Sequence, residues 1–254
     1  MNLSTLVYHR DLFPARLSAA ALDRVKILAL LAMMLDHVNT LFMTPANPLI
    51  YALGRMAFPL FTLIWAMNVH SNPLRLQRRA NRLWLWAALT QPVFMMAFRH
   101  HLPWYALNIL FVFAAVTQLL ALQHRHGVKG LLAGTLPVAA LVAPLTPGSF
   151  GLPGIALACS LALLFSPALS RWRGCAALVV LTSLVCLNGI SHLTSAPADT
   201  LLFATLPTLF LPLLAVRLAQ QHTSEDGPRF MPRHFFYLAY VGHLLALLIL
   251  MQFW

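Results

Sequence analysis

Long apolar runs separated by short polar gaps make up most of the chain. A helix that crosses a bilayer needs roughly 20 mostly apolar residues, and these runs approach that length. The pattern predicts nine spanning helices, over residues 25–43, 49–69, 83–98, 106–122, 131–146, 150–167, 175–190, 200–217 and 235–253. The fifth and sixth runs are short and are divided by Thr146, Pro147 and Gly148, so a pair of re-entrant pieces is the alternative interpretation there.

The composition indicates the same class of protein. Of the 254 residues, 60% are hydrophobic and 9% are charged, whereas a soluble domain carries about 25% charged residues. A globule of this size has too little interior to hide so much apolar surface from water. We therefore expect an all-α polytopic membrane protein, with residues 1–254 forming a single domain within the lipid bilayer.

The basic residues fall into alternate gaps between the runs. Arg99 lies alone in a gap of the other set, and Arg55 lies near or inside the membrane. Because cytoplasmic loops are enriched in basic residues, we expect a cytoplasmic N-terminal segment over residues 1–24 and a periplasmic C-terminus. The remaining 15 of the 17 Lys and Arg residues would then be cytoplasmic: Arg10, Arg16, Arg24, Lys26, Arg75, Arg78, Arg79, Arg82, Arg125, Lys129, Arg171, Arg173, Arg217, Arg229 and Arg233.

The net charge of +11 has other interpretations, which the pattern disfavours. Nucleic-acid binding is not expected, because the basic residues sit in short gaps between apolar runs. No metal site is expected either, because neither His100-His101 nor His124-Arg125-His126 has a third ligand within reach in the sequence. The three cysteines, Cys159, Cys175 and Cys186, lie in or beside apolar runs and are interpreted as small hydrophobic residues.

Ionisable side chains inside spanning helices are costly and usually functional. Asp36 and His37 lie inside the first run, and Arg55 opens the second. Neighbouring residues on a helix point about 100° apart, so Asp36 and His37 are not expected to face each other. We expect Asp36 instead to reach Arg55 on the next helix, or to orient water. A purely structural buried ion pair is the alternative.

The spacing of Lys26 and His37 is the most specific pattern in the first run. They are eleven residues apart, which returns to within about 20° of the same helix face over a rise of about 16 Å. A cation at the membrane edge and an imidazole near its middle would suit acyl transfer from a phosphorylated cytosolic donor. The alternatives are an interfacial lysine that snorkels to the headgroups and a histidine that bonds a neighbouring helix.

Three further polar residues are candidates for the lining of a site. Tyr240 and His243 are three residues apart in the last run and therefore share a helix face. Asn108 lies at the start of the fourth run, after Pro103-Trp104-Tyr105. Each also has a structural interpretation, because a lone histidine often bonds within a bundle and an asparagine often caps a helix.

These residues belong to short motifs that together resemble the TraX family of membrane proteins, which N-acetylate conjugative pilin. The motifs run the length of the chain: Leu35-Asp36-His37, Gly54-Arg55-Met56-Ala57-Phe58-Pro59-Leu60-Phe61, Asn81-Arg82-Leu83-Trp84, Pro103-Trp104-Tyr105, Asn108-Ile109-Leu110-Phe111, Phe235-Phe236-Tyr237 and His243-Leu244. TraX is similar in turn to acyltransferase-3-type membrane enzymes, in which a basic residue precedes a catalytic histidine by eleven positions. Lys26 and His37 match that spacing, although that class commonly has ten spans.

The resemblance implies an enzyme of the bacterial inner membrane that moves acetyl from acetyl-CoA to the N-terminal amine of a pilin subunit. Lys26, with Arg24, would hold the phosphates of CoA. His37 would be the general base or would carry the acetyl group transiently. Arg55 or Asn108 would stabilise the oxyanion of the thioester.

In the same scheme Asp36 would fix the position of Arg55, and His243 would close the site from the last span. Two other functions fit charged residues inside spans. A proton-coupled transporter is one, although its typical inverted repeats are not evident. A non-enzymatic scaffold for pilus assembly is the other, and in that case replacing His37 would leave function intact.

Overall fold

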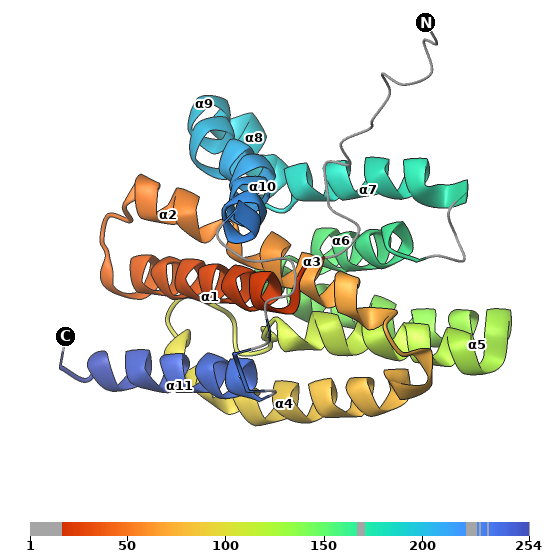
Figure 1. Ribbon diagram of the computed structural model, residues 1–254. Coiled ribbons are helices and arrows are strands. Elements are labelled where there is room, and N and C mark those ends of the chain that lie inside the picture. Colours follow the sequence, from red (N-terminus) through yellow and green to blue (C-terminus); the bar gives the residue numbers. More distant parts are fainter. Residues whose placement is uncertain (1–16, 167–170, 222–227, 229, 233, 254) are drawn as a thin grey trace, which may run out of the picture.

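The computed structural model describes residues 17–166, 171–221, 228, 230–232 and 234–253, and these residues contain helices and no strand. The all-α prediction is confirmed for them (Figure 1). The helices are α1 (Ala19–Phe42), α2 (Pro48–Gly54), α3 (Ala57–Val69), α4 (Leu76–Ala97), α5 (Leu110–Ser149), α6 (Gly151–Leu164), α7 (Arg173–Cys186), α8 (Ile190–Ser195), α9 (Pro197–Thr200), α10 (Leu206–Gln221) and α11 (Phe235–Leu250).

Several helices have the length and hydropathy of membrane spans. Four stretches in the described part of the chain qualify on both measures: Ala19–Phe42, Pro48–Val69, Leu110–Ser149 and Pro197–Gln221. α6, α7 and α11 are apolar but shorter. Large apolar side chains also face outward, among them Leu132, which is 64% exposed, and Leu178, which is 66% exposed. Such a surface suits lipid rather than water, which supports a membrane protein. The nine membrane crossings stay a prediction.

The boundaries differ from the prediction around Pro147. The expected turn at Thr146, Pro147 and Gly148 is wrong, because α5 continues to Ser149 and the chain turns at Phe150, which has a left-handed φ of 67°. Residue 107 packs against the end of α5 and is hydrogen-bonded to it. The amide of Leu107 donates to the carbonyl of Pro144 at 2.9 Å, and Ser149 Oγ donates to the carbonyl of Leu107 at 2.7 Å. The segment at residue 107 therefore holds the end of this proline-containing helix in place.

Other boundaries reflect breaks within the predicted runs. The run over residues 49–69 forms α2 and α3, with a turn at Arg55 and Met56 between them. Gly127 interrupts α5 with a non-helical φ of 59° and ψ of −137°, a conformation that glycine tolerates best. The run over residues 200–217 begins with a π-helical stretch, Leu201–Thr205, that leads into α10.

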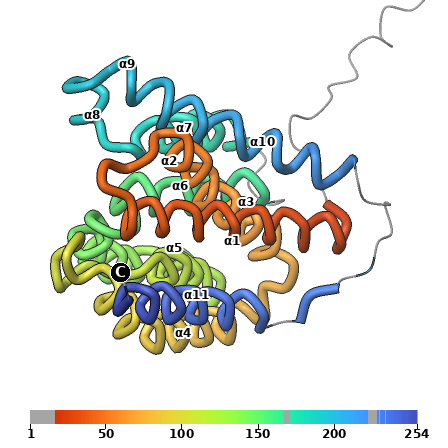
Figure 2. Tube along the Cα trace, turned by 90° about the vertical axis from the view of Figure 1, so that its left-hand side faces the viewer, coloured from red at the N-terminus to blue at the C-terminus, as the bar shows by residue number. Residues whose placement is uncertain are grey.

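The helices lie side by side, with their ends at two opposite faces of the bundle (Figures 1 and 2). The start of α4, the break in α5 and the start of α7 lie at the same end as the start of α1 (Figure 1). The end of α10 lies there too (Figure 2), and the C-terminus lies at the other end. The described gaps that are rich in Lys and Arg are therefore gathered at one end of the molecule.

Small residues allow α1 to lie close to its neighbours. Val25, Ala29 and Ala32 are completely buried on one side of α1, which contacts α2, α3, α10 and α11. Close approach of small residues is the usual basis of helix packing in membranes. Close packing also brings the polar residues of α1 against neighbouring helices, where these residues need hydrogen-bond or charge partners.

Candidate active site

Two helix faces converge in the interior of the bundle. On α1, residues Lys26, Leu30 and Met33 recur at helical spacing and line one cleft, and His37 follows one turn later on the same face. On α11, Phe236, Tyr237 and Tyr240 line that cleft from the opposite wall, and His243 follows one turn later. The face of α1 that carries Lys26 and His37 thus lines the cleft from Lys26 to Met33, and His37 lies one turn beyond.

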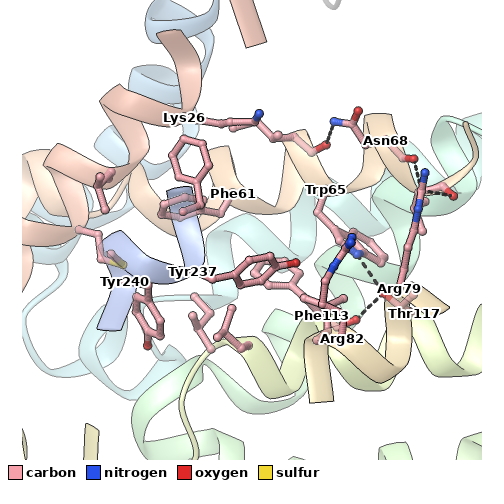
Figure 3. A pocket seen from close by; sticks show the side chains of 18 of the residues that line it. Lys26, Phe61, Trp65, Asn68, Arg79, Arg82, Phe113, Thr117, Tyr237 and Tyr240 are labelled. Atoms are coloured by element: carbon pink, nitrogen blue, oxygen red, sulfur yellow. Dashed lines mark hydrogen bonds between the residues drawn. The ribbon is translucent and has the colours of Figure 1, made fainter. Parts of the chain in front are cut away.

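We call this hollow the central cleft; its volume is about 490 Å³. Figure 3 shows Arg79 and Arg82 toward one side of it, Tyr240 toward the other, and Lys26 along the edge between them. The two arginines therefore lie at one end, and mainly apolar and aromatic groups line the rest of the cleft. The lining consists of Lys26, Leu30, Met33, Phe61, Ile64, Trp65, Asn68, Val69, Ser71, Arg79, Arg82, Leu83, Ile109, Leu110, Phe113, Thr117, Phe236, Tyr237 and Tyr240.

His37 and His243 form a direct pair just beyond Met33 and Tyr240. His37 Nδ1 lies 2.9 Å from His243 Nε2, and the two rings are stacked with centroids 5.0 Å apart. Phe98 packs edge-on against His37, also with centroids 5.0 Å apart. The sequence predicted both histidines as site residues, but the contact between them joins positions 206 residues apart and has no signal in local spacing.

Asp36 and Arg55 form the predicted ion pair between α1 and the end of α2. The two side chains are 23% and 13% exposed, so little water surrounds them. The Arg55 guanidinium also lies over the ring of Tyr51, 4.3 Å from its centroid. Its Nε is buried and has no hydrogen-bond partner among the described residues. Asp36 therefore holds Arg55 while one guanidinium donor stays available.

Gly54 allows this ion pair to form. A Cβ at Gly54 would lie 2.6 Å from Asp36 Oδ1 and 2.7 Å from Asp36 Cβ, distances that non-bonded atoms do not tolerate. We predict that Gly54→Ala destabilises the protein by about 1–3 kcal/mol, because α1 and α2 must move apart. Denaturant titration in detergent would measure this loss. Gly174→Ala is the matched control, since a Cβ at Gly174 meets nothing within 4 Å; equal stabilities for the two variants would contradict the close contact.

Lys26 is held by groups from two helices. Its Nζ donates to Asp23 Oδ1 at 2.8 Å and lies 5.1 Å from the centroid of the Phe236 ring. Asp23 is fully buried, and its Oδ2 accepts from the backbone amides of Phe230 and Met231, each at 3.2 Å. Asp23 thereby ties the segment before α11 to the start of α1. This role of Asp23 could not be predicted from the sequence, because nothing local links residues 23 and 230.

We predict that Asp23→Ala loosens this tie. Loss of the carboxylate leaves two backbone amides and one ammonium without their acceptor, which costs about 1–3 kcal/mol for a buried group. Hydrogen exchange at Phe230 and Met231 should then become faster in detergent-solubilised protein. Asp23→Asn keeps one acceptor oxygen and should give an intermediate rate. Unchanged exchange in Asp23→Ala would show that the carboxylate does not hold this segment.

The two arginines of the cleft have different surroundings. Arg79 donates to the carbonyls of Asn68 and Val69, at 2.6 and 3.2 Å, and to Ser71 Oγ at 2.9 Å, so it binds the end of α3. Arg82 is exposed and points its charge to the cleft. From the sequence, these arginines are expected mainly to set the topology; their position in the cleft depends on the packing of α4 against α11.

Two predicted site residues, Arg24 and Asn108, belong neither to the cleft lining nor to the histidine pair or the ion pair. Arg24 is on α1 but on a different face from Lys26. Asn108 is fully buried; its Nδ2 donates to the carbonyl of Ala87 and to Gln91 Oε1, both at 2.9 Å, and its Oδ1 accepts from the amide of Leu110 at 3.0 Å. These bonds join α4 to the start of α5, which favours the structural interpretation of Asn108.

Comparison with known proteins agrees with the motifs. The family model described as TraX protein matches residues 21–251. The chain belongs to the TraX family. It is 35% identical over 227 residues to Protein TraX of Escherichia coli, a match that covers 89% of this chain and 85% of the relative. It is 34% identical over 226 residues to Protein TraX of Escherichia coli strain K12, with the same two coverages. No solved structure matches the chain significantly.

The TraX match has a direct bearing on the site. It extends from within the first turns of α1 to the end of α11, so it includes Lys26, Asp36, His37, Arg55 and His243. The central cleft and the histidine pair are therefore features of the TraX part of the chain and not of an added segment.

Proposed function

We propose that this protein is a membrane-embedded acetyltransferase that moves acetyl from acetyl-CoA to the N-terminal amine of a conjugative pilin. The observation that carries the proposal is the convergence of α1 and α11. The residues that face each other on these two helices begin with Lys26 and Phe236, which line the cleft together with its two arginines. They end with His37 and His243, which contact each other. A polar site reached through a basic cleft suits a donor with phosphates at one end and a reactive thioester at the other.

The donor phosphates belong with the basic residues of the central cleft. Lys26, Arg79 and Arg82 all line it, and phosphates are recognised by such groups through charge-assisted hydrogen bonds. In the proposed topology of nine spans this end faces the cytoplasm, as the positive-inside rule requires. The location is then the bacterial inner membrane, and acetyl-CoA enters from the cytosol with its thioester directed toward His37.

His37 is the proposed general base. As the amine nitrogen attacks the carbonyl carbon of the thioester, His37 takes a proton from the nitrogen, the C–S bond breaks, and the CoA thiolate receives a proton. A positioned base contributes roughly 10²–10⁴-fold. Holding amine and thioester together away from competing water supplies much of the remaining acceleration. We also propose a relationship to acyltransferase-3-type enzymes, because Lys26 and His37 have the spacing found in that class.

Arg55 is the proposed stabiliser of the oxyanion. Its ion pair with Asp36 lies within electrostatic reach of His37, and its unpaired Nε–H is a donor that a developing oxyanion would satisfy. The acceptor would approach from the other side of the histidine pair. Phe98, which contacts His37, also lines a second hollow of about 270 Å³ with Phe94 and Trp104. An apolar peptide end that is embedded in the membrane fits such walls.

The test is the intact mass of pilin from cells that carry this protein, lack it, or carry His37→Gln. We expect an acetyl-sized increase at the pilin N-terminus only with the unaltered protein. His192→Gln is the control, because His192 lies exposed on α8. Pilin of unchanged mass in every strain would contradict the acceptor. Acetylation that persists in His37→Gln would contradict the role of His37, and pilus assembly without any mass change would favour the scaffold.

A further inference from the structure

We propose that His243 is a positioning residue that fixes the tautomer of His37 and leaves His37 Nε2 as the free basic nitrogen. The role of His243 in catalysis rests on the proposed function. The tautomer of His37 follows from hydrogen-bond geometry alone. His243 is 7% exposed and comes from α11, whereas His37 comes from α1, so the two rings meet only in the folded bundle.

A contact with a backbone carbonyl shows which nitrogen of His243 carries the hydrogen. His243 Nδ1 lies 3.1 Å from the carbonyl oxygen of Ala239, one turn earlier on α11. A carbonyl oxygen only accepts hydrogen bonds, so His243 Nδ1 must carry a hydrogen. In a neutral imidazole the other nitrogen is then a bare acceptor. His243 Nε2 is therefore the acceptor in the 2.9 Å contact with His37.

The contact between the two rings then shows which nitrogen of His37 carries the hydrogen. If His243 Nε2 accepts, His37 Nδ1 must donate, and neutral His37 then has no hydrogen on Nε2. The opposite arrangement needs a positively charged His243. That charge would be added to a low-dielectric interior in which the Asp36 carboxylate is already paired with Arg55, which is unfavourable. The neutral chain from His37 through His243 to the Ala239 carbonyl satisfies every nitrogen except His37 Nε2.

No other described side chain competes for this role. Asp36 is paired with Arg55 and points to α2, so it does not orient the His37 ring. Phe98 contacts the ring edge-on but has no hydrogen-bonding group. Tyr240 packs against His243, with ring centroids 5.5 Å apart, and supports its position. His243 is thus the group that orients His37, as a carboxylate does in other histidine-containing sites.

The chain also provides a balanced route for the proton. When His37 Nε2 takes the proton of the attacking amine, His37 becomes the charged ring, and its Nδ1–H continues to donate to His243 Nε2, which stabilises the charge. As the C–S bond breaks, His37 Nε2 gives its proton to the CoA thiolate and His37 becomes neutral again. Both rings return to their starting state, and no oxidant, reductant or water is consumed.

The direct test is ¹⁵N solid-state NMR of histidine-labelled protein in lipid, with His37 signals identified by their loss in His37→Gln. We expect His37 to be protonated on Nδ1 in the unaltered protein. In His243→Leu, which removes the acceptor, most His37 should change to the Nε2-protonated form. His243→Gln keeps an acceptor oxygen and should retain part of the original population. His37 protonated on Nε2 in the unaltered protein would overturn the inference.

Activity measurements separate this inference from the proposed function. With a synthetic pilin peptide and acetyl-CoA, we expect kcat to fall about 10²–10⁴-fold in His243→Leu, the range seen when a catalytic histidine loses its orienting partner or its role as base. His243→Gln should recover part of that loss, and His192→Gln should match the unaltered protein. Full acetylation by His243→Leu would overturn the positioning role. An Nδ1-protonated His37 in a protein that acetylates nothing would support the tautomer and contradict the enzyme.

Discussion

Replacing Asp36 by alanine is expected to destabilise the protein by about 3–5 kcal/mol, one of the largest effects of any single substitution outside the hydrophobic core. Asp36 is the charge partner of Arg55, and the pair lies between α1 and α2 with little exposure. Without the carboxylate, a guanidinium is left uncompensated in a low-dielectric interior, because arginine does not lose its proton in proteins. The free energy of unfolding in detergent micelles, measured by denaturant titration, gives the size of the effect.

The double variant Asp36→Asn/Arg55→Gln distinguishes loss of a partner from loss of the pair. Removing both charges leaves two amides that can bond each other, so the double variant should be more stable than Asp36→Ala. Asp199→Ala is the control for removal of an acidic group, because Asp199 is exposed on α9. If Asp36→Ala unfolds at the same denaturant concentration as Asp199→Ala, the ion pair does not stabilise the folded bundle.

Local sequence was sufficient to predict some of this site. Helix periodicity alone placed Lys26 and His37 on one face of α1; Lys26, Leu30 and Met33 of this face line the cleft, and His37 follows one turn beyond them. Because an unpaired charge inside a membrane is unfavourable, the sequence also predicted that Asp36 pairs with Arg55, as the structure shows. Both inferences concern residues close in the chain, where the geometry of one helix or of two consecutive helices limits the choices.

Features that depend on distant packing could not be predicted in the same way. The contact of His37 with His243 and the bonds of Asp23 to residues 230 and 231 depend on where α11 docks. The helical conformation around Pro147 was missed for a related reason. A proline weakens a helix locally, but here hydrogen bonds to the distant segment at residue 107 hold the end of α5.

The packing of α11 therefore determines two properties of the site at once. At one end it brings Phe236 under Lys26, and at the other it brings His243 onto His37. A shift of α11 along its axis by one turn would separate both pairs together, since a turn is about 5.4 Å. The tie between Asp23 and the start of this segment consequently affects the histidine pair as well as the basic end of the cleft.

Two substitutions, one in the histidine pair and one in the cleft, should affect different kinetic quantities. His37→Gln is expected to lower kcat by about 10²–10⁴-fold, because a glutamine side chain cannot take up a proton at neutral pH. Its affinity for acetyl-CoA should stay nearly unchanged, since His37 lies beyond the lined part of the cleft. Purified protein in liposomes, acetyl-CoA and a pilin peptide give kcat, and equilibrium binding of CoA gives the affinity.

Arg82→Gln should do the reverse. Arg82 lines the cleft with an exposed charge, and one charge-assisted bond to a phosphate contributes about 1.5–3 kcal/mol, so the affinity for CoA should fall roughly 10- to 100-fold while kcat is nearly preserved. Arg78→Gln is the matched control, because Arg78 is exposed on the same helix but does not line the cleft. If both arginine variants weaken CoA binding equally, general surface charge and not the cleft attracts the donor. If His37→Gln weakens binding and leaves kcat intact, the histidine pair contacts the donor without taking part in the transfer of the acetyl group.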